Sequence, residues 1–210
     1  CDAMNAEAAA KVFEVKQRPQ FDPLIVHIAD LKQLEMLIES LPAVGQRLID
    51  TFWPGPLTLV LPKQPAIPDL ITAGLSTVAV RMPNHPVAQT LIREAGTPIA
   101  APSANPFGYV SPTTAQHVAD GLGNRVDLIL DGGPCPVGVE STIISLAGSQ
   151  PELLRPGSIT IEQLSSIIGS IRQSLSVNHK PIAPGQLSRH YATRTPLTIL
   201  ASARARPILK

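Results

Sequence analysis

The chain has 210 residues and a mass of 22.3 kDa, the size of one domain or of one domain with part of a second. Hydrophobic residues make up 44%, which excludes general disorder, and aromatic residues only 3%, which argues against stacking platforms for single-stranded nucleic acid. No apolar run approaches the roughly 18 residues of a membrane span. Cys1 and Cys135 are too few for a disulfide framework or a zinc site. We therefore expect a globular protein of the cytoplasm.

The charge is distributed unevenly along the chain. Residues 1–162 hold all 16 Asp and Glu against 10 Lys and Arg, a balance of −6, whereas residues 163–210 hold 7 Lys and Arg and no acid. An acidic body argues against a broad nucleic-acid surface, because contact with several phosphates needs clustered cations. The basic tail could contact RNA, a membrane or the acidic body, and the last is the simplest. We expect neither membrane attachment nor strong direct nucleic-acid binding.

Helices and strands alternate in the first half of the predicted structure. Apolar residues at helical spacing predict helices over 6–15, 30–40, 44–52 and 85–95. Asn5 and Asp30 are predicted caps at helix starts, and Gly96 is predicted to close the fourth helix. Short apolar runs predict strands over 23–28, 57–61 and 77–82.

The second half is predicted to add a strand over 98–101, a loop over 102–112, helices over 113–121 and 159–168, and strands over 128–131, 141–145 and 153–155. Several strands follow one another directly, which favours an α/β fold with a twisted mixed sheet and helices on its faces. We expect one domain over 1–169. Residues 170–196 lack periodicity and read as a linker, and residues 197–210 as the stub of a further domain.

Separated cations are the first candidates for chemistry, because the chain has no glycine-rich phosphate loop and no dinucleotide-binding fingerprint. Lys16 and Arg18 stand two residues apart where a helix is predicted to end, so both can face one cleft. Arg81 and Arg155 each end a predicted strand, where a guanidinium can point at an anion. The alternative for Lys16 and Arg18 is that they complement the dipole at the end of a helix, and the alternative for Arg81 and Arg155 is that each forms a surface ion pair.

Polar side chains gather near the ends of the predicted strands. Ser103 and Asn105 follow the strand over 98–101, at the edge where open α/β sheets bind ligands. Ser111 belongs to a run of hydroxyls that either caps the next helix or contacts phosphate, and Ser141 stands at the mouth of another strand. His27 lies inside a buried run, where a satisfied core histidine is expected. No catalytic triad follows from the spacing.

Seven short motifs, in a fixed order along the chain, indicate a family more specifically than the composition does. They are KQRP at 16–19, PLIVH at 23–27, WPGPLT at 53–58, VRMP at 80–83, APSAN at 101–105, STI at 141–143 and RPG at 155–157. In this order they resemble the YrdC-type L-threonylcarbamoyladenylate synthases. Pro184-Gly185 and His190-Tyr191 resemble the interdomain linker of the family's long form, so the likeness extends over residues 1–196.

The resemblance implies a twisted mixed sheet around an open, positively charged cavity. It also implies an enzyme that makes threonylcarbamoyl-AMP and pyrophosphate from L-threonine, bicarbonate and ATP, with Mg²⁺ accompanying the nucleotide and no metal site of the protein itself. A partner complex then transfers the threonylcarbamoyl group to tRNA adenosine 37. The family's upstream strand and turn would precede Cys1, so we expect this chain to be a fragment that lacks part of the threonine site.

Matching the family's motifs to this sequence implies roles for individual residues. Lys16 and Arg18 would be catalytic through the phosphates. The nucleotide would be bound by Arg18, Asp22, Thr77, Ser103, Asn105, Ser111, Arg155 and Tyr191. Threonine would be bound by His27, Arg81, Ala101 and Ser141. Asp22 departs from the family, which usually has Asn there.

Two other classes of protein are alternatives to the threonylcarbamoyl-AMP synthases. The chain could instead be a carbamoyl-transfer domain like that of hydrogenase-maturation proteins, or a non-catalytic RNA-binding module. We further expect residues 170–196 to fold across the cavity as a lid with Tyr191 near the nucleotide, the alternative being a simple tether.

Overall fold

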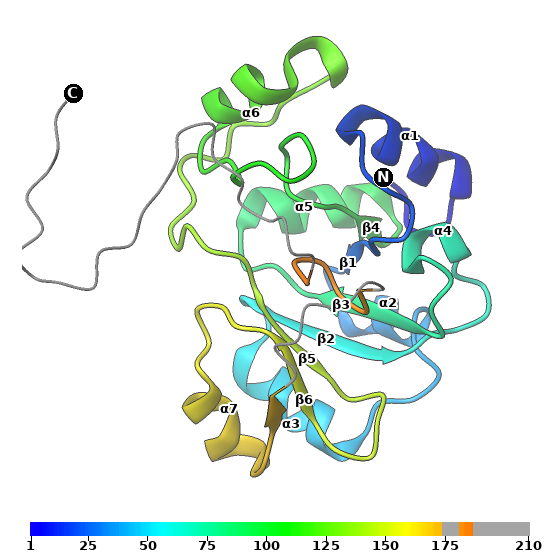
Figure 1. The fold of residues 1–210 in the computed structure, drawn as a ribbon, viewed down its shortest axis with the longest axis vertical. Helices are drawn as coiled ribbons and strands as arrows, with labels where there is room; N and C mark the ends of the chain where they lie inside the picture. Colours follow the sequence, from blue (N-terminus) through cyan, green and yellow to red (C-terminus); the bar gives the residue numbers. More distant parts are fainter. Residues whose placement is uncertain (174–180, 187–210) are drawn as a thin grey trace, which may run out of the picture.

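A mixed sheet forms the centre of the computed structural model, which describes residues 1–173 and 181–186 (Figure 1). Its seven described strands run in the order β4-β1-β3-β2-β5-β6-β7. They are β1 (Ile25–His27), β2 (Leu57–Pro62), β3 (Thr77–Arg81), β4 (Ile99–Ala100), β5 (Thr142–Ser145), β6 (Glu152–Arg155) and β7 (Arg172–Gln173). The pairs β1·β3, β2·β5 and β6·β7 are parallel, and β1·β4, β2·β3 and β5·β6 are antiparallel. The predicted mixed sheet is confirmed.

The helices begin and end close to the predicted positions where their caps are strong. They are α1 (Ala6–Lys16), α2 (Leu31–Glu35), α3 (Ala43–Phe52), α4 (Asp69–Thr72), α5 (Pro86–Ala95), α6 (Ala115–Leu122) and α7 (Ile161–Ile168). Asn5 accepts hydrogen bonds from the first turn of α1, Asp30 caps α2, and Gly96 ends α5 in the left-handed conformation. None of the described helices has the length and apolar character needed to cross a membrane.

The two faces of the sheet pack differently. Leu59, Val80 and Ile144 belong to the large core cluster, which also includes residues of several helices. Their neighbours Val60, Ala79 and Ile143 point to the other face, because side chains alternate along a strand, and form a small cluster with Leu154 and Ala183. Figure 1 shows segment 181–186, in orange, over the middle of the sheet. One face of the sheet therefore packs against the large core, and the other face is covered in part by segment 181–186.

The helix predicted over 30–40 is shorter than expected. It ends at Glu35, because the next residues bond to the chain at the end of β2 instead of continuing the helix. The Glu39 N–H donates to the carbonyl of Pro62, and the Gln64 N–H donates to the carbonyl of Leu37. Ile38 forms an isolated bridge with Lys63.

The strand predicted over 128–131 is wrong. These residues have no partner strand in the described part of the chain, and Leu128 and Leu130 are exposed at 75% and 52%. Alternating apolar residues form a strand only where a second backbone pairs with them. Conversely, Arg172 and Gln173, placed in the linker by composition, form β7 beside β6, supported by a 2.7 Å ion pair from Arg172 to Glu152.

Candidate functional site

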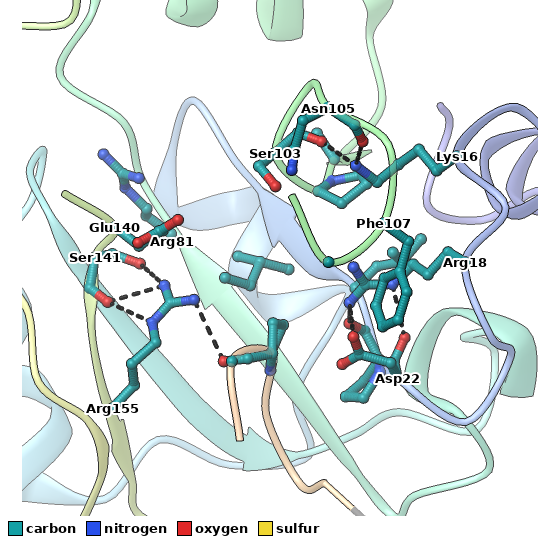
Figure 2. A pocket seen from close by; sticks show the side chains of 18 of the residues that line it. Lys16, Arg18, Asp22, Arg81, Ser103, Asn105, Phe107, Glu140, Ser141 and Arg155 are labelled. Carbon is teal, nitrogen blue, oxygen red and sulfur yellow. Dashed lines mark hydrogen bonds and ion pairs between the residues drawn. The ribbon is translucent and has the colours of Figure 1, made fainter. Parts of the chain in front are cut away.

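An open cavity of about 250 Å³ lies on the less densely packed face of the sheet (Figure 2). It is bordered by the end of α1, the ends of β1, β3 and β6, the loop after β4, the chain before β5, and segment 181–186. Ten of the residues predicted for the site line it: Lys16, Arg18, Asp22, His27, Arg81, Ala101, Ser103, Asn105, Ser141 and Arg155. The expectation that the separated cations share one cleft is confirmed.

The end of α1 delivers the first two cations. Gln17 adopts the left-handed conformation with a φ of 54°, and the N–H groups of Gln17 and Arg18 donate to the carbonyls of Glu14 and Phe13. This reversal of the chain brings Lys16 and Arg18 to the same cavity.

Lys16 is buried and is oriented by the loop after β4. Its Nζ donates to the main-chain carbonyls of Ser103 and Asn105. Burial, assisted by the neighbouring charge of Arg18 and opposed by Asp22, lowers the pKa of Lys16 to about 8. The Asn105 amide nitrogen donates to the carbonyls of Pro106 and Tyr109, which fixes the turn that presents these carbonyls.

Arg18 and Asp22 form a buried ion pair. Arg18 Nη2 lies 2.9 Å from Asp22 Oδ2 and also donates to the carbonyl of Pro23 at 2.8 Å, while the guanidinium stands 5.7 Å from the centre of the Phe107 ring. Asp22 Oδ1 is buried without a hydrogen-bond partner among the described residues. Burial raises the pKa of Asp22 to about 6, and Arg18 opposes the shift. Asp22 thus neutralises one cation and keeps one buried acceptor oxygen without a partner among the described residues.

Arg155 is oriented by Ser141 and by segment 181–186. Its Nε and Nη2 donate to the Ser141 carbonyl at 3.1 and 2.9 Å, and Nη1 donates to the carbonyl of Pro184 at 3.3 Å. The Ser141 hydroxyl accepts from Nη2 at 3.1 Å and lies 2.7 Å from the hydroxyl of Thr58. Burial lowers the pKa of Arg155 to about 10, opposed by Glu140. The guanidinium therefore remains charged at neutral pH.

Arg81 and His27 end adjacent parallel strands and face the same cavity. Arg81 Nε donates to the carbonyl of Gly55 at 3.0 Å. His27 is half-buried, and desolvation by its surroundings together with the charge of Arg81 lowers its pKa to about 4, so the ring is neutral. Its Nδ1 has no hydrogen-bond partner in the described part of the chain, so the core does not satisfy both ring nitrogens.

Main-chain carbonyls orient all four cations of the cavity. Lys16, Arg18, Arg81 and Arg155 each donate to at least one carbonyl oxygen. A carbonyl dipole fixes a cation without cancelling its charge, so the four positive charges stand against only two carboxylates among the lining residues, Asp22 and Glu140. The site is suited to an anionic ligand.

Two predicted residues lie away from the cavity lining, and a third is not among the described residues. Thr77 lies at the start of β3, the opposite end from Arg81, and pairs with Pro62. Ser111 borders an adjoining hollow and donates from Oγ to Glu140 Oε1 at 2.6 Å. Tyr191 lies outside the described residues, as does most of the predicted lid. Their roles in nucleotide binding stay predictions.

The cavity also contains residues that the sequence reasoning did not assign. They are Glu140, Phe107, Tyr109, Pro184 and Gly185 among others. Glu140 is next to Ser141 and could have been found from that neighbour. No local signal marks Phe107, because its place beside Arg18 depends on a loop far along the chain.

A mixed sheet that gathers cations and neutral acceptors from strand ends into one cavity defines a binding site for small, multiply charged anions. The profile of the Sua5/YciO/YrdC family, described as "Telomere recombination", matches residues 1–157, and a profile described as "Threonylcarbamoyl-AMP synthase, C-terminal domain" matches residues 159–209. The chain belongs to the Sua5/YciO/YrdC family.

Two relatives illustrate how far the likeness extends. A Bacillus subtilis protein named threonylcarbamoyl-AMP synthase is 52% identical over 202 residues, which cover 94% of this chain and 58% of that protein. The crystal structure of Pyrococcus abyssi Sua5 complexed with L-threonine is 47% identical, with a TM-score of 0.89 over 91% of this chain and 58% of the other. This chain therefore spans less than two thirds of the length of either relative.

The alternative of a hydrogenase-maturation domain shares the architecture. The crystal structure of HypF from T. kodakarensis superposes with a TM-score of 0.64 at 20% identity, covering 75% of this chain and 20% of that one. At this identity the likeness shows a common fold alone.

Proposed function

We propose that this chain forms the substrate site for the synthesis of threonylcarbamoyl-AMP from L-threonine, bicarbonate and ATP, with release of pyrophosphate. The observation that carries the proposal is the single cavity in which Lys16, Arg18, Arg81 and Arg155 meet, held by carbonyl oxygens. The relatives support it: one is named for this activity, and the other was crystallised with L-threonine.

The nucleotide is proposed to bind with its phosphates toward Lys16 and Arg155. Both are charged at neutral pH and both donate to main-chain carbonyls, whereas Arg18 forms an ion pair with Asp22. Charge-assisted hydrogen bonds from ammonium and guanidinium groups to phosphate are the strong ones in proteins. The charge of Arg18 is already offset by Asp22, so Arg18 would add less net positive charge at the phosphates than Lys16 or Arg155 does.

Mg²⁺ is proposed to arrive with ATP. The described residues hold no cluster of three or more metal-ligating side chains, and the cavity offers two carboxylates, Asp22 and Glu140. One or two carboxylates plus substrate phosphates is the donor set that Mg²⁺ uses in nucleotide sites, and the unpartnered Asp22 Oδ1 fits it. When bound, the ion would neutralise phosphate charge.

L-Threonine is proposed to bind at the β1 and β3 ends. The Arg81 guanidinium is fixed through Nε and presents its other nitrogens to a ligand carboxylate. Neutral His27, with an unsatisfied Nδ1, can bond to a polar group of the amino acid. Both side chains are half-buried, which limits the water around that ligand.

The reaction requires no protein nucleophile. Threonine amine and bicarbonate would form an N-carboxylate, with a C–N bond made as a C–O bond of bicarbonate breaks and water is released. An oxygen of the N-carboxylate would then attack the α-phosphorus, forming one P–O bond as the bond to pyrophosphate breaks. Lys16, Arg18 and Arg155 would hold the phosphates and offset the charge that develops on them. A site with cations and no triad is suited to this chemistry.

The product is proposed to pass to a separate complex that transfers the threonylcarbamoyl group to tRNA. The acidic balance of residues 1–162 supports assigning tRNA binding to that partner. We expect the protein to work in the cytoplasm, where ATP and tRNA are available together.

The test is a product assay. The full-length protein is incubated with ATP, radiolabelled bicarbonate and each amino acid in turn, and labelled adenylate is separated by chromatography. We expect a labelled adenylate when the added amino acid is threonine and not when it is any other amino acid. Label that depends on carbamoyl phosphate, or no adenylate together with salt-dependent tRNA binding, would contradict the proposal in favour of the alternatives.

A variant tests the site itself. Arg155→Ala should weaken ATP binding by about ten- to a hundredfold, since a charge-assisted hydrogen bond contributes roughly 1.5–3 kcal/mol. Arg93→Ala, on the exposed surface of α5, is the matched control and should leave ATP binding unchanged. Calorimetric titration measures both; equal affinities for the two variants would remove Arg155 from the nucleotide site.

A further inference from the structure

We propose that Glu140 binds the α-ammonium group of the amino-acid substrate, opposite Arg81, and that Ser111 positions the Glu140 carboxylate. The inference rests on the proposed function and adds to it a specificity-determining residue. An α-amino acid carries a carboxylate and an ammonium group on one carbon. A site that selects it needs an anion and a cation a few ångströms apart, in fixed relation.

Glu140 is on the correct side of the cavity for this role. Figure 2 shows Glu140 and Ser141 on the same side as Arg81, whereas Asp22 lies on the other side with Arg18 and Phe107. Asp22 is already bound to Arg18 at 2.9 Å. Glu140 is thus the carboxylate that can act together with Arg81.

One turn fixes the relation between the two groups. The carbonyl of Gly55 accepts from Arg81 Nε at 3.0 Å, and the carbonyl of the next residue, Pro56, accepts from the Thr142 N–H at 3.0 Å. A Cβ on Gly157 would lie 2.6 Å from the Glu140 carbonyl, so the chain there is held closely from the other side. The backbone that carries Glu140 is therefore anchored to the same turn as Arg81.

Ser111 fixes the carboxylate itself. Its Oγ donates to Glu140 Oε1 at 2.6 Å, a bond that joins the loop after β4 to the chain before β5. The bond restricts the rotation of a side chain that is only partly buried. Ser111, expected from the resemblance to face ATP, acts in this proposal through Glu140 as a positioning residue.

The proposed contact has a consequence for the reaction. The amine nitrogen held by Glu140 is the atom that becomes carboxylated in the proposed synthesis. A carboxylate there fixes the reacting end of the amino acid while Arg81 fixes the inert end. The site would then discriminate against acids that carry a hydroxyl in place of the amino group.

The experiment compares L-threonine with its analogue in which a hydroxyl replaces the amino group, by calorimetry on the full-length protein. The wild type should prefer threonine by about tenfold or more. Glu140→Gln should lose that preference by weakening threonine binding alone. Its affinity for ATP, measured without added Mg²⁺, should not fall, because the change then removes only a negative charge near the phosphate-binding cations.

Matched variants make the result specific. Asp22→Asn removes the other carboxylate of the cavity and should keep the preference for threonine, whereas Arg81→Ala should weaken both acids. Ser111→Ala should reduce the preference and Ser111→Thr, which keeps the hydroxyl, should restore it. A Glu140→Gln protein that still prefers threonine, or that weakens ATP and both acids equally, would overturn the inference. A wild type that binds no threonine would instead overturn the proposed function.

Discussion

Lys16 is an ammonium group in an unusual environment. It is buried, close to the positive charge of Arg18, and bonded to two neutral carbonyl oxygens. Each of these features disfavours the charged form or leaves its charge uncancelled, and the pKa falls to about 8. A residue proposed to bind phosphate is thus poised to lose its proton just above neutral pH.

The pH dependence of ATP binding follows from that pKa. Lys16 is charged below about pH 8 and neutral above it, so the affinity for ATP should fall as the pH rises through this value. Phosphates favour the charged form, so binding above about pH 8 should take up a proton. Calorimetry in buffers of different ionisation enthalpy measures this uptake. Lys16→Arg should bind ATP without uptake and without the fall; a wild type whose affinity is constant across this range would contradict the prediction.

The sequence was sufficient to find the cations but not their partners. Lys16 and Arg18 follow a predictable helix end, and Arg81 and Arg155 end apolar strands, so local pattern and strand direction place them at one edge. The contact of Ser111 with Glu140 joins residues 29 apart, and that of Lys16 with Asn105 joins residues 89 apart. Such contacts depend on loop paths, for which the sequence has no periodic signal.

At the scale of elements, a close approach of two backbones holds one side of the cavity. Gly157, just after β6, lies against the residues that lead into β5, which carry Glu140 and Ser141. Segment 181–186 covers the neighbouring part of the sheet and donates no side-chain charge to the cavity; it contributes the Pro184 carbonyl to Arg155. The close approach of Gly157 fixes the chain of Ser141, and segment 181–186 supplies the Pro184 carbonyl, so both hold groups that bond to Arg155.

Gly157→Ala should destabilise the fold and loosen the Arg155 site. The new Cβ would lie 2.5 Å from the Thr142 nitrogen and 2.6 Å from the Glu140 oxygen, and both are backbone atoms that cannot move aside freely. We expect a loss of about 1–3 kcal/mol in the free energy of unfolding. Gly148→Ala is the control, since its nearest atom is 3.8 Å away, and should change stability by less than about 0.5 kcal/mol. Urea unfolding of both variants decides; equal stability would show that the backbones separate easily.

Gln186 should matter for ATP binding although it does not line the cavity. Its Oε1 accepts from the N–H groups of Ile182 and Ala183 at 2.9 and 3.2 Å, which folds segment 181–186 into the shape that presents Pro184 to Arg155. Gln186→Ala removes a buried acceptor from two donors, at about 1–3 kcal/mol, and should weaken ATP binding severalfold. Gln173→Ala, an exposed position on β7, is the control and should have no effect. An unchanged ATP affinity of Gln186→Ala would show that the segment is dispensable to the site.

Elements with strong local signals were predictable, and elements defined by pairing were not. Capped helices such as α1 and α5 begin and end within one residue of expectation. Residues 128–131 have the alternation of a strand and no partner in the described sheet, whereas β7 has two residues and no pattern at all. Pairing is a property of two segments, so a single segment does not encode it.

For the molecule as a whole, the two faces of the sheet have different tasks: one contributes most of the core packing, and the other carries the binding cavity. One face joins the large core, where side chains such as Leu59 are fully buried. The other face has the small cluster and the cavity. The adjacent residues Leu59 and Val60 on β2 point to opposite sides of this division, which makes them a matched pair.

Leu59→Ala and Val60→Ala should therefore have different effects. Leu59→Ala should cost about 2–5 kcal/mol in unfolding free energy, and the surviving folded protein should bind ATP normally. Val60→Ala removes one buried carbon atom fewer and should cost less than about 2.5 kcal/mol, but it should weaken ATP binding by loosening the packing under Ala183. Chemical unfolding and calorimetry on each variant test the division. Equal loss of ATP affinity in both would contradict it.

The carbonyl groups that orient the four cations bear on how this sequence can change over time. A carbonyl belongs to every residue, so the side chains of Ser103 and Pro184 are not what the cations recognise. Mutational tolerance at such positions should follow the path of the backbone: changes that keep the path are accepted, and changes at Gly157 or at the turn of Asn105 are not. In a deep mutational scan, the intolerant positions would be the cations and the residues that shape the chain around them. Relatives can then diverge widely in the loops while keeping the same arrangement of positive charge.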